Sequence, residues 1–128
     1  DVILVGVSRT GKTPTCIYLG LQFGIYAANY PVTGEDFTQK DKRIFNLISP
    51  YKKKVFGLTI NPERLHKIRS ERRPGSRYAS LGQCRLEIAM CESFFISEDI
   101  PFLNITSMSI EEIAATITHA HKLPRRVV

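Results

Sequence analysis

Eight residues near the start of the chain, GVSRTGKT from Gly6 to Thr13, have the residue types and spacing of a phosphate-binding loop. The spacing is G-x-x-x-x-G-K-T, the pattern of a P-loop. In such a loop, successive backbone N–H groups and the positive N-terminus of the following helix surround a phosphate group. The sequence therefore predicts that an oligophosphate, such as a nucleotide, binds here.

The chemistry of each loop residue suggests a role. Gly6 and Gly11 permit backbone geometry and a close approach that a Cβ would obstruct. Lys12 supplies a flexible cation for phosphate oxygens, and Thr13 supplies a hydroxyl for Mg²⁺. Arg9 could clamp a second phosphate with its planar guanidinium, or it is a solvated loop charge. The predicted nucleotide site comprises Gly6, Val7, Ser8, Arg9, Thr10, Gly11, Lys12 and Thr13.

A carboxylate is the second group that phosphoryl transfer to a hydroxyl requires. Glu35 and Asp36 follow the second apolar stretch of the chain, and Asp36 is the best candidate. It could accept a proton from a hydroxyl substrate or hold Mg²⁺ through water. The alternative is a solvated loop carboxylate. Asn61 stands where a Walker-B aspartate might stand, but it is neutral and a helix-capping role explains it.

A basic segment offers positive charge for the transition state. Arg69, Arg72, Arg73 and Arg77 surround a Pro-Gly break in the stretch IRSERRPGSRY. We interpret this segment as a lid that brings guanidinium groups onto developing negative charge, with Arg72 and Arg73 as the catalytic candidates. The alternative is the solvated basic end of a helix.

The elements that must position these residues alternate along the chain. The run Val2–Val5 predicts a buried strand before the loop, and a helix should follow it, with Pro14 in its first turn. Further strands are predicted at 25–30, 53–60 and 101–106. Helices are predicted around 40–47, after a cap at Asn61, over about 78–96, and after a capping box of Ser109 and Glu112.

This alternation predicts an α/β fold of the P-loop NTPase or kinase type, a parallel sheet covered by helices on both faces. Ligands of such sheets bind at the carboxyl ends of the strands. We therefore expect the phosphate loop, the loop of Glu35 and Asp36, and Asn61 to share one cleft.

Length and charge restrict the class of protein. The 128 residues, with a net charge of +6, suit one globular domain whose partner is a nucleotide, a nucleic acid or an acidic protein surface. Nucleic acid is disfavoured because no zinc spacing, helix-turn-helix or aromatic-studded RNA motif is present. No membrane span or signal peptide is found, and three cysteines without a framework suggest a reducing cytoplasm. Because Asp1 leads directly into a strand, we expect 1–128 to be a single P-loop kinase-like domain, the C-terminal part of a longer protein.

Four stretches resemble the bifunctional kinase/pyrophosphorylase family, which contains regulatory proteins of phosphoenolpyruvate synthase and of pyruvate, phosphate dikinase. They are DVILVGVSRTGKTPT, FGIYAANYP, FGLTINPERLHKIRSERRPGSRYASLGQCRLE and SIEEIAATI. The similarity covers nearly the whole chain and is greatest to the synthase-regulating branch. The family's nucleotide-binding stretch corresponds to Gly6 through Thr13. Relatives often have Ser in place of Gly11 and Asp in place of Asn61.

The resemblance implies a bifunctional cytoplasmic enzyme. One activity uses ADP to phosphorylate a threonine of phosphoenolpyruvate synthase (pyruvate, water dikinase), which inactivates the synthase and releases AMP. The other removes that phosphate with inorganic phosphate and gives pyrophosphate. ADP, inorganic phosphate and Mg²⁺ are thus the implied ligands, and we expect one anion site to serve both reactions. The alternatives are an ATP-dependent small-molecule P-loop kinase, a nucleic-acid-binding ATPase, and a nucleotide-binding module that is inactive without its N-terminal part.

Overall fold

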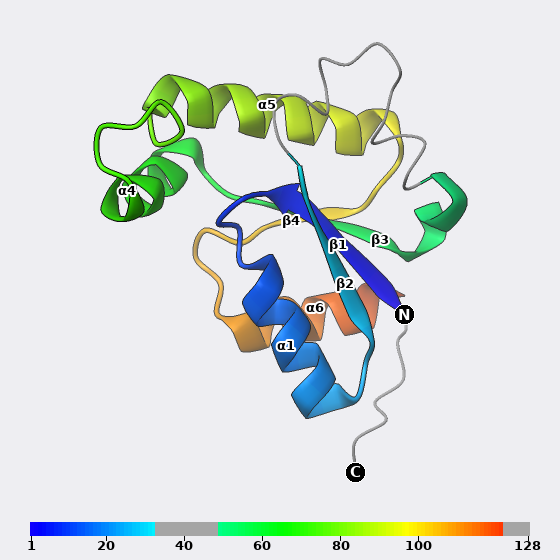
Figure 1. Cartoon of the computed structure of the whole chain (residues 1–128). Coiled ribbons are helices and arrows are strands. Elements are labelled where there is room, and N and C mark those ends of the chain that lie inside the picture. The colour runs from blue at the N-terminus through cyan, green and yellow to red at the C-terminus, as the bar shows by residue number, and fades with distance from the viewer. Residues whose placement is uncertain (33–48, 122–128) are drawn as a thin grey trace.

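A four-stranded parallel sheet forms the centre of the molecule. The computed structural model describes residues 1–32 and 49–121, and within them the strands are β1 (Val2–Val7), β2 (Ala27–Val32), β3 (Val55–Thr59) and β4 (Phe102–Asn104). Their order across the sheet is β2-β1-β3-β4, with every neighbouring pair parallel. The strand that precedes the phosphate loop therefore lies between two neighbours (Figure 1).

Helices cover both faces of this sheet. On one side lie α1 (Lys12–Phe23) and α6 (Ile110–His121), and on the other lie α4 (Pro62–Arg72) and α5 (Leu81–Ser97) (Figure 1). A short 3₁₀ helix, η1 (Ser49–Lys54), precedes β3. The predicted α/β fold is confirmed.

The alternation of side chains along β1 divides the core into two layers. Val5 and Val7 pack with buried residues of α4 and α5, whereas Val2 and Leu4 pack with buried residues of α1 and α6. The first layer includes Leu65, Cys84, Ile88, Cys91 and Phe95, and the second includes Leu19, Ile113, Ala114 and Ile117. Apolar residues are required on both faces of β1, which explains its continuous apolar sequence.

Three strands begin later than predicted: β4 starts at Phe102, one residue late, and β2 and β3 start late because the ends of the preceding helices involve their first predicted residues. The N–H of Ile25 donates to the carbonyl of Leu19 at 3.1 Å, so Ile25 closes the end of α1 and β2 starts at Ala27. Lys53 and Lys54 belong to η1, so β3 starts at Val55. The helix predicted around 40–47 lies outside the described residues.

The two predicted helix caps had different outcomes. Ser109 and Glu112 form the capping box, in which each backbone N–H donates to the other side chain, at 3.2 and 3.1 Å. Asn61 occupies the N-cap position of α4, but its side chain makes no capping hydrogen bond. Its Oδ1 accepts from Nδ2 of Asn104 at 2.9 Å instead. The prediction of a side-chain cap at Asn61 is therefore wrong, because a contact with the end of β4 takes the amide oxygen.

Candidate functional site

The backbone between β1 and α1 curls into the shape that binds anions. Arg9 and Gly11 have φ angles of +71° and +76°, in the left-handed region that residues other than glycine rarely adopt. When residues with a left-handed backbone conformation alternate with residues in the usual right-handed region, their successive backbone N–H groups point into one concavity. The strained Arg9 is the kind of outlier that persists at functional sites. The local geometry thus supports the predicted phosphate loop.

Gly6 is required by the approach of the neighbouring strand. A Cβ built on Gly6 would lie 2.6 Å from the carbonyl oxygen of Leu58 and 2.9 Å from Oγ1 of Thr10. The first contact is with a backbone atom of β3, so it could be relieved only if the neighbouring strands moved apart. Any side chain at Gly6 would therefore displace the start of the loop.

The side chain of Lys12 lies inside the loop. Its Nζ donates to the carbonyl of Val7 at 2.6 Å and to Oγ1 of Thr10 at 3.2 Å. The hydroxyl of Thr10 also donates to the carbonyl of Val7, at 2.8 Å. Lys12 is buried, and its desolvation lowers its pKa from 10.5 to about 8. A cation so poorly solvated is well placed to pair with a phosphate oxygen.

The lowered pKa of Lys12 predicts that phosphate affinity depends on pH. Above about pH 8 the Lys12 ammonium loses its proton, whereas the phosphates of ADP are already ionised. The affinity for ADP should therefore fall above pH 8, approaching about tenfold per pH unit, with proton uptake on binding. Calorimetric titrations in buffers of different ionisation enthalpy measure both the affinity for ADP and the proton uptake. In the variant Lys12→Arg the charge persists, and this slope should vanish; an equal slope in both proteins would refute the assignment to Lys12.

Thr13, the predicted metal ligand, presents its hydroxyl at the start of α1. Its hydroxyl is exposed in the first turn of α1 and accepts a hydrogen bond from Nδ2 of Asn29 on β2, at 3.1 Å. Among the described residues, no three His, Cys, Asp or Glu side chains gather as a metal site. Mg²⁺ is commonly held by few protein oxygens together with phosphates and water. The Thr13 hydroxyl fits that pattern, with Asn29 orienting it.

A cleft of about 420 Å³ opens in front of the loop. This volume is within the range of small-molecule sites. Its wall includes Asn29 and Pro31 from β2, Ile68 from α4, and Tyr78. The loop contributes Ser8, Arg9, Gly11, Lys12, Thr13 and Pro14. The remaining predicted loop residues, Gly6, Val7 and Thr10, are buried behind them.

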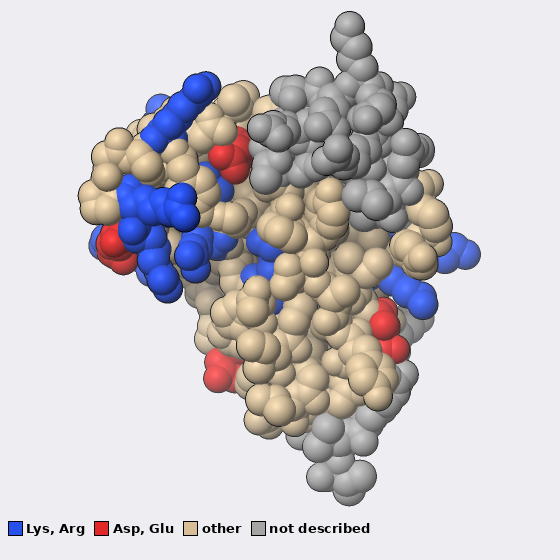
Figure 2. All heavy atoms as spheres, viewed as in Figure 1, with Lys and Arg blue, Asp and Glu red and all other residues tan. Residues whose placement is uncertain are grey.

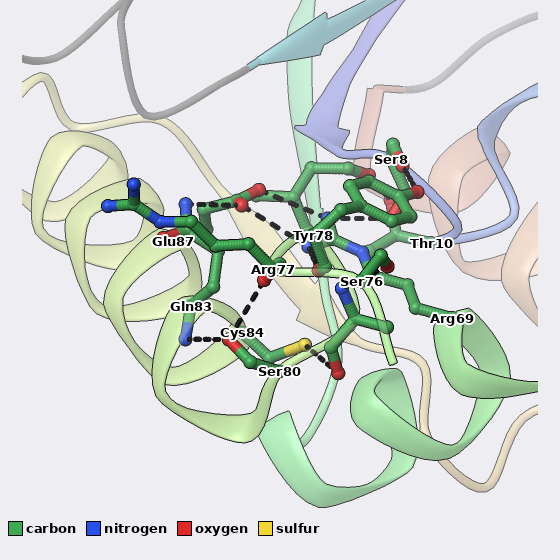
Figure 3. A network of polar contacts seen from close by, with 12 residues as sticks. Ser8, Thr10, Arg69, Ser76, Arg77, Tyr78, Ser80, Gln83, Cys84 and Glu87 are labelled. Atoms are coloured by element: carbon green, nitrogen blue, oxygen red, sulfur yellow. Dashed lines mark hydrogen bonds and ion pairs between the residues drawn. The ribbon is translucent and has the colours of Figure 1, made fainter. Parts of the chain in front are cut away.

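A buried ion pair supports the loop from the side of α4 and α5. The guanidinium of Arg69 is fully buried and donates to the two carboxylate oxygens of Glu87, at 3.0 and 3.2 Å (Figure 3). It also donates to the backbone carbonyls of Tyr78 at 3.1 Å and Ser8 at 3.3 Å. Gln83 donates to the same carboxylate at 2.8 Å. The interpretation of Arg69 as part of a lid is therefore wrong, because its charge is neutralised in the interior.

The other arginines of the basic segment are on the surface. Arg72, Arg73 and Arg77 are exposed, and Figure 2 shows Lys and Arg side chains gathered over α4 and its connection to α5. The closing movement of this segment stays a prediction. Its backbone is ordered by turns such as the hydrogen bond from Ala79 to the carbonyl of Ser76, at 3.1 Å.

The other predicted members of the cleft have different outcomes. Asn61 is not among the residues that line the described cleft; its N–H donates to the hydroxyl of Thr106 at 2.9 Å, and its role there is structural. Glu35 and Asp36 lie outside the described residues, so their place in the cleft stays a prediction.

Sequence reasoning missed Asn29, Tyr78 and the burial of Arg69. Asn29 carried a usable signal, because a polar residue near the carboxyl end of a strand points to the ligand edge of a parallel sheet. Tyr78 and Ser8 are 70 positions apart, and no local pattern indicates their contact. For Arg69 the run of neighbouring arginines suggested exposure.

Comparison with known proteins identifies relatives along the whole chain. A family model described as "Kinase/pyrophosphorylase" matches residues 1–118. A protein of Halorhodospira halophila named "Putative phosphoenolpyruvate synthase regulatory protein" is 59% identical over 99% of this chain and 46% of its own length. Proteins of the same name from Laribacter hongkongensis and Alkalilimnicola ehrlichii are both 57% identical, over 98% and 99% of this chain.

This chain spans less than half the length of those relatives, 45–46% in the three cases. In residues 1–32 and 49–121, no helix has both the length and the apolar character needed to cross a membrane.

Proposed function

Because the chain belongs to the kinase/pyrophosphorylase family, we propose that it supplies the nucleotide site of a bifunctional cytoplasmic regulator of phosphoenolpyruvate synthase. In one direction, the β-phosphoryl group of ADP passes to a threonine hydroxyl of the synthase and AMP leaves. In the other, inorganic phosphate takes the phosphoryl group from phosphothreonine, which restores the hydroxyl and gives pyrophosphate. The names of the relatives, which refer to regulation of that synthase, support the choice of partner.

The observation that carries this proposal is the phosphate loop with Lys12 buried inside it. The terminal phosphate of ADP is the group to be transferred, and this loop is the described structure best suited to hold it. In the reverse direction the same N–H groups and ammonium would hold inorganic phosphate or the pyrophosphate product. One anion site thereby serves both reactions.

The side chains around the loop divide the remaining tasks. Lys12 offsets the negative charge of the phosphoryl oxygens, and Arg9 borders the same cleft. Mg²⁺, when bound, would neutralise phosphate charge and align the groups, with Thr13 as its protein ligand. The basic segment that contains Arg73 would add further positive charge beside the cleft.

Asp36 is proposed as the base for the threonine hydroxyl, and the two directions should respond differently to its loss. A hydroxyl needs its proton accepted, a contribution of about 10²–10⁴-fold in rate, whereas phosphate is already an anion. Asp36→Asn should therefore depress the ADP-dependent kinase activity more than phosphorolysis. Equal loss in both directions would indicate a metal-holding role, and no loss in either would make Asp36 a solvated loop carboxylate.

Product analysis tests the proposed function as a whole. The protein is incubated with phosphoenolpyruvate synthase and ADP, and separately with the phosphorylated synthase and inorganic phosphate. AMP with threonine labelling, and pyrophosphate in the second mixture, are expected. ATP turnover on a metabolite would favour the small-molecule kinase instead. If ADP binds without either product, the chain is a nucleotide-binding module that requires the remaining length of its relatives.

A further inference from the structure

Tyr78 is held against the phosphate loop by several groups. Its hydroxyl is hydrogen-bonded to the hydroxyl of Ser8, and its ring lies 4.1 Å from the guanidinium carbon of Arg69, which also binds the backbone carbonyls of both residues. Figure 3 shows Tyr78 between Ser8 and the Arg69–Glu87 pair. Tyr78 also lines the cleft. Its ring therefore occupies a defined position at the edge of the ligand site.

The same ring contacts one of the surface arginines. The guanidinium carbon of Arg73 lies 5.9 Å from the centroid of Tyr78, within the range of a cation–π interaction. The backbone of Arg73 is also fixed: its N–H donates to the carbonyl of Arg69 at 2.8 Å, and its carbonyl accepts from the hydroxyl of Ser76 at 2.9 Å. Among the described residues, the Arg72 side chain has no comparable aromatic partner.

We propose that Tyr78 is a positioning residue that holds Arg73 at the mouth of the cleft, so that Arg73, and not Arg72, binds the phosphate ligand. This inference rests on the proposed function, since it requires an oligophosphate in the loop. A guanidinium that lies over an aromatic ring keeps its in-plane N–H groups available for phosphate oxygens. Holding it there before the ligand arrives reduces the entropy lost on binding.

Single-charge variants of neighbouring arginines test the choice of residue. Calorimetric titrations of the chain at low salt use ADP and, separately, inorganic pyrophosphate. Arg73→Gln should weaken binding of both by about tenfold, the usual scale of a charge-assisted hydrogen bond. Arg72→Gln should change it by less than about twofold. Arg64→Gln removes the same charge from an exposed position on α4 and measures the effect of net charge alone.

A double-mutant cycle of Tyr78 and Arg73 tests whether Tyr78 acts through Arg73. Tyr78→Leu should weaken binding about as much as Arg73→Gln, and adding Arg73→Gln to it should have little further effect, because the two residues act as a unit. Tyr78→Phe keeps the ring, so the full effect of Arg73→Gln should remain. A purely structural role of Tyr78 would instead make the two losses add. Thermal unfolding of each variant confirms that it is folded; if Tyr78→Leu does not fold, Tyr78→Met, which also removes the ring, takes its place in the same comparison.

Different results would reject the role of Arg73, the role of Tyr78 and the proposed function. Equal losses in Arg72→Gln and Arg73→Gln, or a larger loss in Arg72→Gln, overturn this inference while the proposed function stands. Additive losses in Tyr78→Leu and Arg73→Gln overturn the role of Tyr78. A wild-type chain that binds neither ADP nor pyrophosphate overturns the proposed function and this inference with it.

Discussion

Replacing Lys12 with alanine should abolish transfer in both directions. Lys12 is the buried cation of the loop, with its Nζ on the carbonyl of Val7 and the hydroxyl of Thr10. In the proposed function both reactions place a phosphate group in this loop, so both should lose the same charge. The loss of one preorganised donor typically costs about 10²–10³-fold in kcat. Rates of AMP formation and of pyrophosphate formation, at saturating substrate, measure the effect.

A lysine far from the loop provides the matched control. Lys52 is an exposed residue of η1, and Lys52→Ala removes the same charge and side chain. We expect this variant to retain both activities. If Lys12→Ala kept phosphorolysis while losing the kinase activity, the two reactions would use different anion sites and the single-site proposal would be rejected.

Replacing Glu87 with alanine should destabilise the fold by about 3–5 kcal/mol, because it leaves the buried guanidinium of Arg69 without its counterion. Arg69 is fully buried, and Glu87 is its acidic partner at 3.0 Å. Since the free energy of unfolding of a domain is only about 5–15 kcal/mol, such a loss should shift the unfolding midpoint strongly. Urea unfolding followed by circular dichroism measures it.

An exposed ion pair of the same two helices serves as the comparison. Glu63 on α4 lies 3.7 Å from Arg85 on α5, and both side chains are more than half exposed. Solvent screens such a pair, so Glu63→Ala should cost no more than about 1 kcal/mol. Similar shifts for Glu87→Ala and Glu63→Ala would contradict the view that the buried pair supports the loop and the α4–α5 layer.

The parts that the sequence by itself determined are those set by near neighbours in the chain. The phosphate loop is one continuous stretch, so its backbone N–H groups, the ammonium of Lys12 and the hydroxyl of Thr13 all come from eight consecutive residues. The capping box of Ser109 and Glu112 closes within one helical turn. The parallel sheet follows from the alternation of apolar strands and helices. The loop and the capping box depend on interactions over a few residues, and the sheet is indicated by apolar runs that are each local, so a pattern in the sequence can reveal them even though the strands themselves pair over long separations, such as Ile3 with Val55.

Only the tertiary structure decided which polar side chains meet. Arg69 resembles its exposed neighbours in sequence, yet it faces α5, where Glu87, 18 positions away, neutralises it. Asn61 has the sequence of a helix cap, but the end of β4 brings Asn104 to its amide. Tyr78 reaches Ser8 because α4 and α5 pack on the same face of the sheet. Burial and pairing of this kind depend on how helices and strands distant in sequence pack together, and local residue order does not specify that packing.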